Sequence, residues 1–164
     1  MHVSIYARIY EMQEPQATQE LPFKIEAIPY VVDDYKTIRY LLIKRTPQDG
    51  GYWQPMTGTL NDGEKLLNCV KRELNEETGI RAEDIIDISE LLYKFDWKNK
   101  RGDTILEFVY AVQYPANTEI VLSPEEHDDY KWCSFGEAME TLYTDNNKNA
   151  LKIVNGILLE SLTK

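Results

Sequence analysis

The chain has 164 residues, of which 43% are hydrophobic and 11% aromatic, which is typical of one globular domain with a sizeable core. Its 28 acidic residues outnumber its 18 lysines and arginines, and the net charge of −10 argues against binding to nucleic-acid polymers. The sequence has neither a signal-peptide core nor an apolar run near the ~18 residues of a membrane span, so we expect a cytoplasmic protein without a membrane partner.

Residues 1–20 are interpreted as an N-terminal extension, and residues 21–164 as the main domain. Apolar and polar residues alternate from Met1 to Tyr10, a pattern that favours a short strand. The segment from Glu11 to Pro22 is polar and contains two prolines, which is typical of a linker. Three interpretations stay open for the extension: an edge strand, an arm onto the second subunit of a homodimer, or an ill-ordered end.

Two strands and a loop are predicted next. Phe23–Val32 and Thr37–Lys44 are rich in apolar residues, and a pair of aspartates between them favours a turn. The second strand leads to Arg45, which is either a solvated cation at a strand end or a contact to a substrate phosphate. After the loop, Trp53 is expected to pack in or beside the core. Its neighbour Gln54 is a candidate for a polar contact with a substrate.

A helix is predicted between the turn-forming segment Asn61–Gly63 and Gly79. Asp62 is the candidate N-cap, and Gly79 can end the helix in the left-handed conformation without a Cβ clash. The helix would have about fourteen residues, near the ordinary length in globular proteins. One apolar arc is expected to face a core, and it contains Leu67, Val70 and Leu74.

Three glutamates of this helix, Glu73, Glu76 and Glu77, stand at i, i+3 and i+4 and share one arc. They repel one another, and they lie in the C-terminal half, where the helix dipole disfavours negative charge. Arg72 reaches Glu76 at i+4, but one cation does not neutralise three acids. The arc is therefore either a solvated acidic face or a site for a divalent metal, since Mg²⁺ binds carboxylates together with phosphates and water.

The segment from Gly58 to Ile80 resembles the signature of the Nudix hydrolases. That signature is Gly, five residues, Glu, seven residues, Arg-Glu, an aliphatic, any residue, Glu-Glu, any residue, Gly and an aliphatic. The chain matches it without departure, at Gly58, Glu64, Arg72, Glu73, Leu74, Glu76, Glu77, Gly79 and Ile80. Seven fixed residue types at ~7% usage would recur by chance at about 10⁻⁸ per start position, so the resemblance is specific.

The rest of the chain predicts further strands followed by two helices. The expected strands span Ser89–Trp97, Thr104–Tyr114, Glu119–Leu122 and Tyr130–Cys133. The first two read as a hairpin, whose cationic tip either protects a sheet edge or steers phosphates. Ser134 with Glu137 predicts a capped helix, and an apolar stripe predicts a last helix over Asn147–Leu162. This order is typical of an α/β/α sandwich with a mixed sheet, and the Nudix resemblance implies the same α/β fold.

The resemblance also assigns roles within the signature. It implies that Glu73, Glu76 and Glu77 hold Mg²⁺ or Mn²⁺. It further implies that Arg72 orients a glutamate of its own helix, so all four residues are expected to be catalytic. Glu64 is expected to be a more peripheral, structural acid.

A further carboxylate outside the signature acts in many Nudix members as a metal ligand or general base. Here the Glu126-His127 step resembles one that precedes a Tyr-x-Trp strand in some subfamilies. We therefore expect Glu126 to be catalytic, with Glu125 as the alternative, unless both are solvated loop acids. His127 is expected to be a local hydrogen-bonding residue rather than part of the site.

The implied reaction is attack of water on a pyrophosphate that joins a nucleoside to another group. The elements around Gln54, Glu126 and Asn147 resemble dihydroneopterin triphosphate (dATP) pyrophosphohydrolases, so the expected partner is a small nucleotide or a pteridine triphosphate. Diadenosine tetraphosphate, ADP-ribose and other nucleotide sugars are alternative substrates. An alternative of another class is a nucleotide-sensing module without catalysis, which the complete set of glutamates argues against.

Overall fold

The computed structural model describes residues 22–164. The strand and the homodimer arm predicted for the N-terminal extension lie outside these residues, as does the predicted domain boundary, and they stay predictions. Within the described part of the chain, no helix combines the length and the apolar character that crossing a membrane requires.

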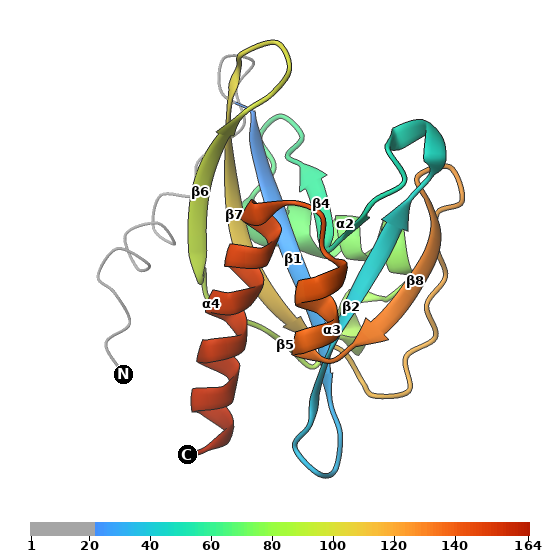
Figure 1. The fold of residues 1–164 in the computed structure, drawn as a ribbon, viewed down its shortest axis with the longest axis vertical. Helices are drawn as coiled ribbons and strands as arrows, with labels where there is room; N and C mark the ends of the chain where they lie inside the picture. Colours follow the sequence, from blue (N-terminus) through green and yellow to red (C-terminus); the bar gives the residue numbers. More distant parts are fainter. Residues whose placement is uncertain (1–21) are drawn as a thin grey trace.

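One mixed sheet of eight strands forms the centre of the described residues (Figure 1). Its central strand, β1 (Phe23–Val32), pairs in parallel with β7 (Thr104–Gln113) and antiparallel with β2 (Ile38–Arg45) and β4 (Met56–Thr59). Strands β3 (Trp53–Gln54) and β8 (His127–Cys133) each pair antiparallel with β2. Strands β5 (Asp87–Ile88) and β6 (Tyr93–Lys98) each pair antiparallel with β7.

Helices cover both faces of this sheet (Figure 1). Helix α2 (Leu66–Thr78) packs on one face, and α3 (Phe135–Thr141) and α4 (Asp145–Leu162) pack on the other. Each helical layer contributes its apolar side chains to a separate hydrophobic core. The predicted α/β/α sandwich with a mixed sheet is confirmed.

Strand β1 is buried on both faces because a helical layer covers each of them. Ile25 and Ala27 belong to the core under α2, whereas Ile28 and Tyr30 belong to the core under α3 and α4. This follows the period-two alternation of a strand. The same alternation places Glu26 on the face covered by α3 and α4, where it is fully buried.

Helix α2 begins later than predicted. Its N-cap is Lys65, which makes no side-chain cap hydrogen bond, so the prediction that Asp62 caps the helix is wrong. The carboxylate of Glu64 instead accepts the backbone N–H of Asn61 at 3.0 Å and closes the turn before the helix. Gly79, with φ of 77°, ends the helix in the left-handed conformation as predicted.

The buried face of α2 also differs from the prediction. Leu67 is 37% exposed, so the prediction that it faces the core is wrong, whereas Val70 and Leu74 are fully buried. Leu66 is buried in its place, because residues at i, i+4 and i+8 form one row along a helix, and this row is Leu66, Val70 and Leu74. The same rotation turns two of the three signature glutamates inward.

The predicted hairpin is confirmed as β6 and β7. The predicted strand at Glu119–Leu122 is wrong, because this segment is irregular. The N–H of Val121 donates to the carbonyl of Thr78 at the end of α2, so the segment serves the helix end rather than a sheet.

The two C-terminal helices begin at side-chain caps. Ser134 and Glu137 form the predicted capping box at the start of α3. Helix α4 begins at Asp145, two residues before the predicted start, because the Thr144 side chain accepts the N–H of Asn147.

Candidate active site

The signature helix α2 lies close to β4 because the strand has a glycine at the contact. A Cβ atom at Gly58 would overlap the Cγ and Cδ atoms of Glu73. Glycine therefore allows the Glu73 carboxylate to lie against the strand. This packing places Glu73 at the wall of a cavity of about 340 Å³, which Arg72, Glu126 and His127 also line.

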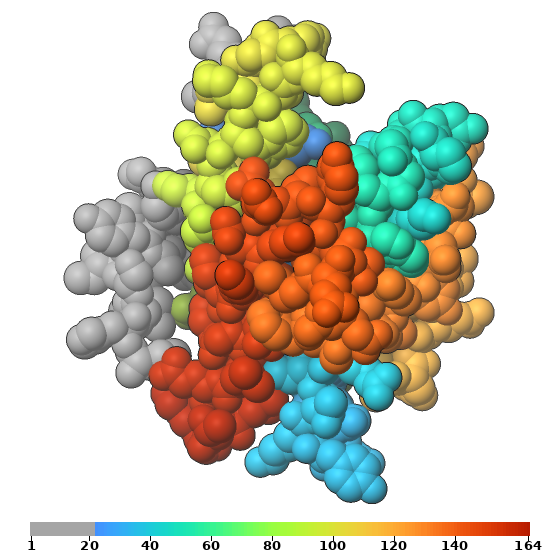
Figure 2. All heavy atoms as spheres, in the orientation of Figure 1, coloured from blue at the N-terminus to red at the C-terminus, as the bar shows by residue number. Residues whose placement is uncertain are grey.

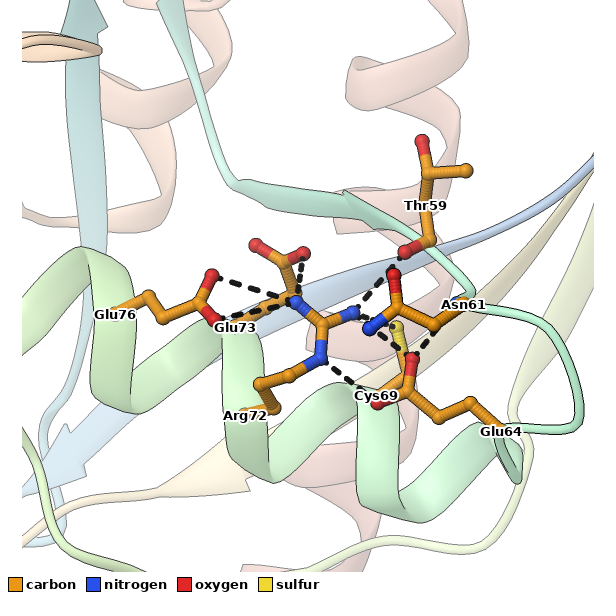
Figure 3. Close-up of polar contacts among 7 residues, drawn as sticks. All are labelled: Thr59, Asn61, Glu64, Cys69, Arg72, Glu73 and Glu76. Atoms are coloured by element: carbon orange, nitrogen blue, oxygen red, sulfur yellow. Dashed lines mark hydrogen bonds and ion pairs between the residues drawn. The ribbon is translucent and has the colours of Figure 1, made fainter.

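Arg72 lies at the centre of a network of carboxylates on and beside α2 (Figure 3). Its guanidinium forms a bidentate pair with Glu64, with Nε–Oε2 at 2.7 Å and Nη2–Oε1 at 2.8 Å. Its Nη1 donates to Glu73 at 2.9 Å and to Glu76 at 3.3 Å. Its Nη2 also donates to the carbonyl of Thr59 at 3.1 Å. One cation thus holds three carboxylates and the preceding loop in fixed positions.

Glu64 and Arg72 keep each other ionised. The hydrogen bonds from Arg72 lower the pKa of Glu64 to about 2, and the same bonds raise the pKa of Arg72 above its usual range. Because Glu64 uses two donors of the guanidinium, its carboxylate fixes the plane in which Arg72 meets Glu73.

The three signature glutamates of α2 occupy different environments. Glu77 is 2% exposed and Glu73 is 9% exposed, whereas the side chain of Glu76 is 53% exposed. Burial raises the pKa of Glu73, and the contact with Arg72 opposes this shift. The spacing put the three glutamates on one arc, but packing against the sheet turns two inward and leaves one in solvent.

Glu77 reaches from α2 across to β8. Its Oε2 lies 2.6 Å from Nδ1 of His127, and Nε2 of His127 lies 3.3 Å from Nε2 of Gln54. A neutral imidazole satisfies both contacts when Nδ1–H donates to Glu77 and Nε2 accepts the Gln54 amide. Burial acts to raise the pKa of Glu77, but the hydrogen bonds with His127 and Glu126, and the charge of Arg45, hold it below its usual value.

Glu126 lies in the turn before β8, exposed to solvent. Its hydrogen bond with Glu77, followed by burial and the charges of nearby glutamates, raises the pKa of Glu126 to about 7. One ligand atom each of Glu77, Glu126 and His127 lies within 4.8 Å of the others. Two carboxylates and an imidazole therefore converge on one point.

This group fits a hard divalent ion. Carboxylate oxygens are the ligands that Mg²⁺ and Mn²⁺ prefer in proteins. The raised pKa of Glu126 reflects crowding with Glu77, and a bound cation would remove the repulsion between the two ionised groups. Among the described residues, this group and the buried Glu73 nearby can supply such oxygens.

Cations and amide donors lie opposite these acids. Arg45, Gln54 and Lys24 line the 340 Å³ cavity and also an adjoining cavity of about 200 Å³. The guanidinium of Arg45 lies 5.4 Å from the ring centre of Tyr52, and its buried Nε has no hydrogen-bond partner among residues 22–164. Arg45 is half-buried, and an Nε–H without a partner can donate to an anion such as a phosphate.

Residues 26–154 match the family model of the NUDIX domain. The chain belongs to the Nudix family of hydrolases. It is 31% identical over 132 residues to the asymmetrical bis(5'-nucleosyl)-tetraphosphatase of Rattus norvegicus, which covers 79% of this chain and 86% of that protein. It is also 32% identical over 124 residues to an octanoyltransferase of Myxococcus xanthus, but it spans only 33% of the length of that protein.

Solved structures share the Nudix fold of this chain. A C. elegans Ap4A hydrolase has a TM-score of 0.74 at 21% identity, covering 84% of this chain and 98% of its own. The E. coli dihydroneopterin triphosphate pyrophosphohydrolase has a TM-score of 0.68 at 22% identity, covering 81% and 95%. These identities show the fold alone. The family match and the related tetraphosphatase make this Nudix protein an enzyme of the pyrophosphohydrolase class.

The Nudix fold gathers most of the predicted site residues at one place. Arg45, Gln54, Arg72, Glu73 and Glu126 line one cavity, and Glu77 joins it through its bond to His127. Glu76 lies across the Arg72 guanidinium from Glu64 and stays exposed (Figure 3).

The site predicted from the sequence does not include His127, and no role is predicted for Lys24. The signal for His127 was its position directly after Glu126. The signal for Lys24 was a cation two residues before the acid Glu26 in a predicted strand that is mostly apolar.

Proposed function

We propose that this Nudix hydrolase cleaves a phosphoanhydride bond of a small nucleoside polyphosphate with the help of Mg²⁺ or Mn²⁺. The convergence of acids and cations on one cavity carries this proposal. Glu73 and Glu126 lie on its wall, and Arg45 brings a buried donor without a partner among the described residues. Clustered carboxylates suit the metal, and the free guanidinium donor suits a phosphate.

The metal ligands in this proposal are the signature residues Glu73, Glu76 and Glu77. When bound, the metal neutralises phosphate charge and makes an attacking water more acidic. Arg72 acts as a positioning residue, because it already contacts Glu73 and Glu76. His127 positions Glu77 in the same way from β8.

Glu126 is the proposed general base. It lines the cavity, and its carboxylate lies within 4.8 Å of ligand atoms of Glu77 and His127, beside the place where a bound metal would hold the attacking water. It takes a proton from the attacking water while Arg45 and Lys24 hold the phosphates in place. Glu125, which precedes it in the same turn, is the alternative.

We propose two types of substrate. The first is a triphosphate such as dATP or dihydroneopterin triphosphate, cleaved to a monophosphate and pyrophosphate, as the elements around Gln54 and Glu126 indicate. The second is a dinucleoside tetraphosphate, which the 31% identity to a tetraphosphatase over most of both chains favours. ADP-ribose is a further alternative. Cys69 and Cys133 are both free and buried, which supports the proposed reducing, cytoplasmic location.

A substrate panel tests the proposal. The protein is incubated with Mg²⁺ and dATP, GTP, dihydroneopterin triphosphate, diadenosine tetraphosphate or ADP-ribose, and the products are separated by ion-exchange chromatography. We expect turnover of at least one polyphosphate and its loss on addition of a chelator. Glu140→Gln, an exposed change of the same kind on α3, is the control for Glu77→Gln.

Wild-type turnover in Glu77→Gln would overturn the site assignment. Binding without turnover for every compound would instead support a sensing module.

A further inference from the structure

Two buried glutamates lie outside the metal site, in the middle of the sheet. Glu26 of β1 is fully buried and Glu107 of β7 is 4% exposed. Lys24 is the register partner of Glu107 in the parallel β1–β7 pair, so both glutamates lie on the sheet face covered by α4. Neither residue belongs to the Nudix signature, and each interrupts a run of apolar residues.

The carboxyl groups of Glu26 and Glu107 are neighbours, and both are removed from solvent. Asn147 of α4 donates its Nδ2 to Oε1 of Glu26 at 2.9 Å. Oε2 of Glu26 finds no N–H or O–H donor among the described residues, and its neighbour is the carboxyl of Glu107. Two neighbouring ionised carboxylates repel each other, which favours the protonated form of Glu26. Burial and the charge of Glu107 raise the pKa of Glu26 well above its usual value, in agreement with this.

Glu107 is the member of the pair that reaches a cavity. The cavity of about 200 Å³ is lined by Glu107 and by three aromatic rings, those of Tyr52, Phe95 and Trp97. In Figure 2 the yellow-green β6 region and the teal segment before β3 flank a hollow above the start of α4. Four residues of the phosphate-facing cavity also line this one, so the two cavities adjoin: Lys24, Arg45, Gln54 and Thr57.

Glu107 keeps acceptor capacity toward this cavity. An ionised carboxylate offers about four lone-pair sites. Burial raises the pKa of Glu107 to about 7, and the charge of Lys24 and the hydrogen bonds of Trp97 and Glu26 oppose this shift. A carboxylate buried among rings with unused lone pairs is costly unless donors meet it. The remaining lone pairs of Glu107 are therefore able to accept hydrogen bonds from N–H groups of a ligand.

We propose that the aromatic cavity binds the planar heterocycle of the substrate, and that Glu107 selects a guanine or pterin ring by accepting its adjacent ring N–H and amino N–H. This inference rests on the proposed function, which places the phosphates in the adjoining cavity. The rings of Tyr52, Phe95 and Trp97 supply the apolar contact that a flat heterocycle requires.

The acceptor chemistry of Glu107 explains the choice of ring. Guanine and pterin present two neighbouring donors, which match a carboxylate in bidentate geometry. Adenine presents one donor beside a ring nitrogen with a lone pair, which would face a carboxylate oxygen and repel it. A bidentate pair gives about 10- to 100-fold discrimination in such recognition. A site built around buried polar groups rejects the ligand that leaves them unpaired.

A binding experiment tests the inference without requiring catalysis. The affinities of wild-type protein for GMP, IMP and AMP are measured by calorimetry without metal. IMP differs from GMP only in lacking the amino group. We expect GMP to bind about tenfold more tightly than IMP and tighter still than AMP. Equal affinities for the three nucleotides would overturn the proposal, whatever the enzyme hydrolyses.

A matched pair of variants then assigns the selectivity to Glu107. Glu107→Gln replaces one acceptor by a donor and should abolish the preference for GMP over AMP. The exposed Glu90→Gln is the control and should keep the preference. A Glu107→Gln protein that melts like wild type and still prefers GMP would overturn the assignment. Absence of turnover together with selective GMP binding would refute the proposed function but support the ring site.

Discussion

Among residues 22–164, acidic side chains cluster beside α2 and between β1 and β7, and the two regions accommodate them differently. Beside α2, Glu64, Glu73 and Glu76 contact one guanidinium, and the pKa of Glu64 falls to about 2. Between β1 and β7, Glu26 and Glu107 lie against each other, and the pKa of Glu107 rises to about 7. The pKa of one glutamate thus falls in the first region, and the pKa of another rises in the second.

The difference follows from the neighbours and not from burial alone. Desolvation acts against the charge in both regions. Beside α2, Arg72 offsets it for Glu64, whereas between β1 and β7 the charge of Lys24 and the hydrogen bonds of Asn147 and Trp97 oppose it only in part. The first region suits an incoming cation, because its carboxylates converge beside the cavity. The second suits a neutral ring with N–H donors.

The largest expected effect on catalysis comes from removing the charge of Glu77 in the region beside α2. Glu77→Gln keeps a hydrogen-bond acceptor for His127 but removes the negative charge. We expect kcat to fall about 10³-fold, because charge stabilisation at a reaction centre has this magnitude. Steady-state product release measures it, and an unchanged melting temperature relative to Glu140→Gln shows that the fold is intact. A fall below tenfold would contradict the metal role.

The pH dependence of stability separates the two regions. Glu107 has a raised pKa when folded, so its stabilising effect is complete below about pH 4.5 and is lost as the pH rises to about 7. The loss amounts to about 3 kcal/mol of unfolding free energy. Glu64 has a lowered pKa, so its contribution is present above about pH 4.5 and is lost as the pH falls toward 2.

Urea unfolding between pH 4.5 and 7.5 measures this decline. Glu107→Gln should flatten it, whereas Glu126→Gln, whose group titrates in the same range but is exposed, should flatten it less. An equal slope in wild type and Glu107→Gln would show that folding does not raise the pKa of Glu107.

A third prediction displaces one carboxylate without changing its chemistry. In Gly58→Ala the new methyl group takes the space of the Glu73 side chain, which must move away from β4. We expect kcat to fall about 50-fold, near the upper end of the effect of disturbing a metal-ligand shell, and the melting temperature to fall as well, because the overlap is with buried atoms at the α2–β4 contact. The exposed Gly136→Ala, where a Cβ meets nothing within 4 Å, is the control. Equal rates for both variants would mean that the Glu73 position is not critical.

The smallest effect is expected from Arg72→Lys. Lysine keeps the charge but cannot form the fork to Glu64 while also reaching Glu73. We expect kcat to fall about tenfold and the pKa of Glu64, followed by NMR titration, to move up toward its usual value. A Glu64 pKa that stays near 2 in this variant would show that another donor holds it.

The sequence alone determined the signature helix, its glycine stop, the β6–β7 hairpin and the fold class. These features depend on local chemistry and on periodicity, which a linear pattern contains. The residues around Glu73, Glu77 and Arg72 were found because their spacing matches a family signature of low chance frequency. The Glu126-His127 step indicated a contributor from outside the helix, but not that His127 meets Glu77.

Only the tertiary structure decided which side chains meet across the sheet. The row of Leu66 and Val70 set the rotation of α2, which buried Glu77 and exposed Glu76. Pairing of β1 with β7 joined Glu26 to Glu107 across about 80 residues of sequence, although each looks like an ordinary strand residue. Such contacts depend on strand register and layer packing between distant segments, and no local pattern encodes them.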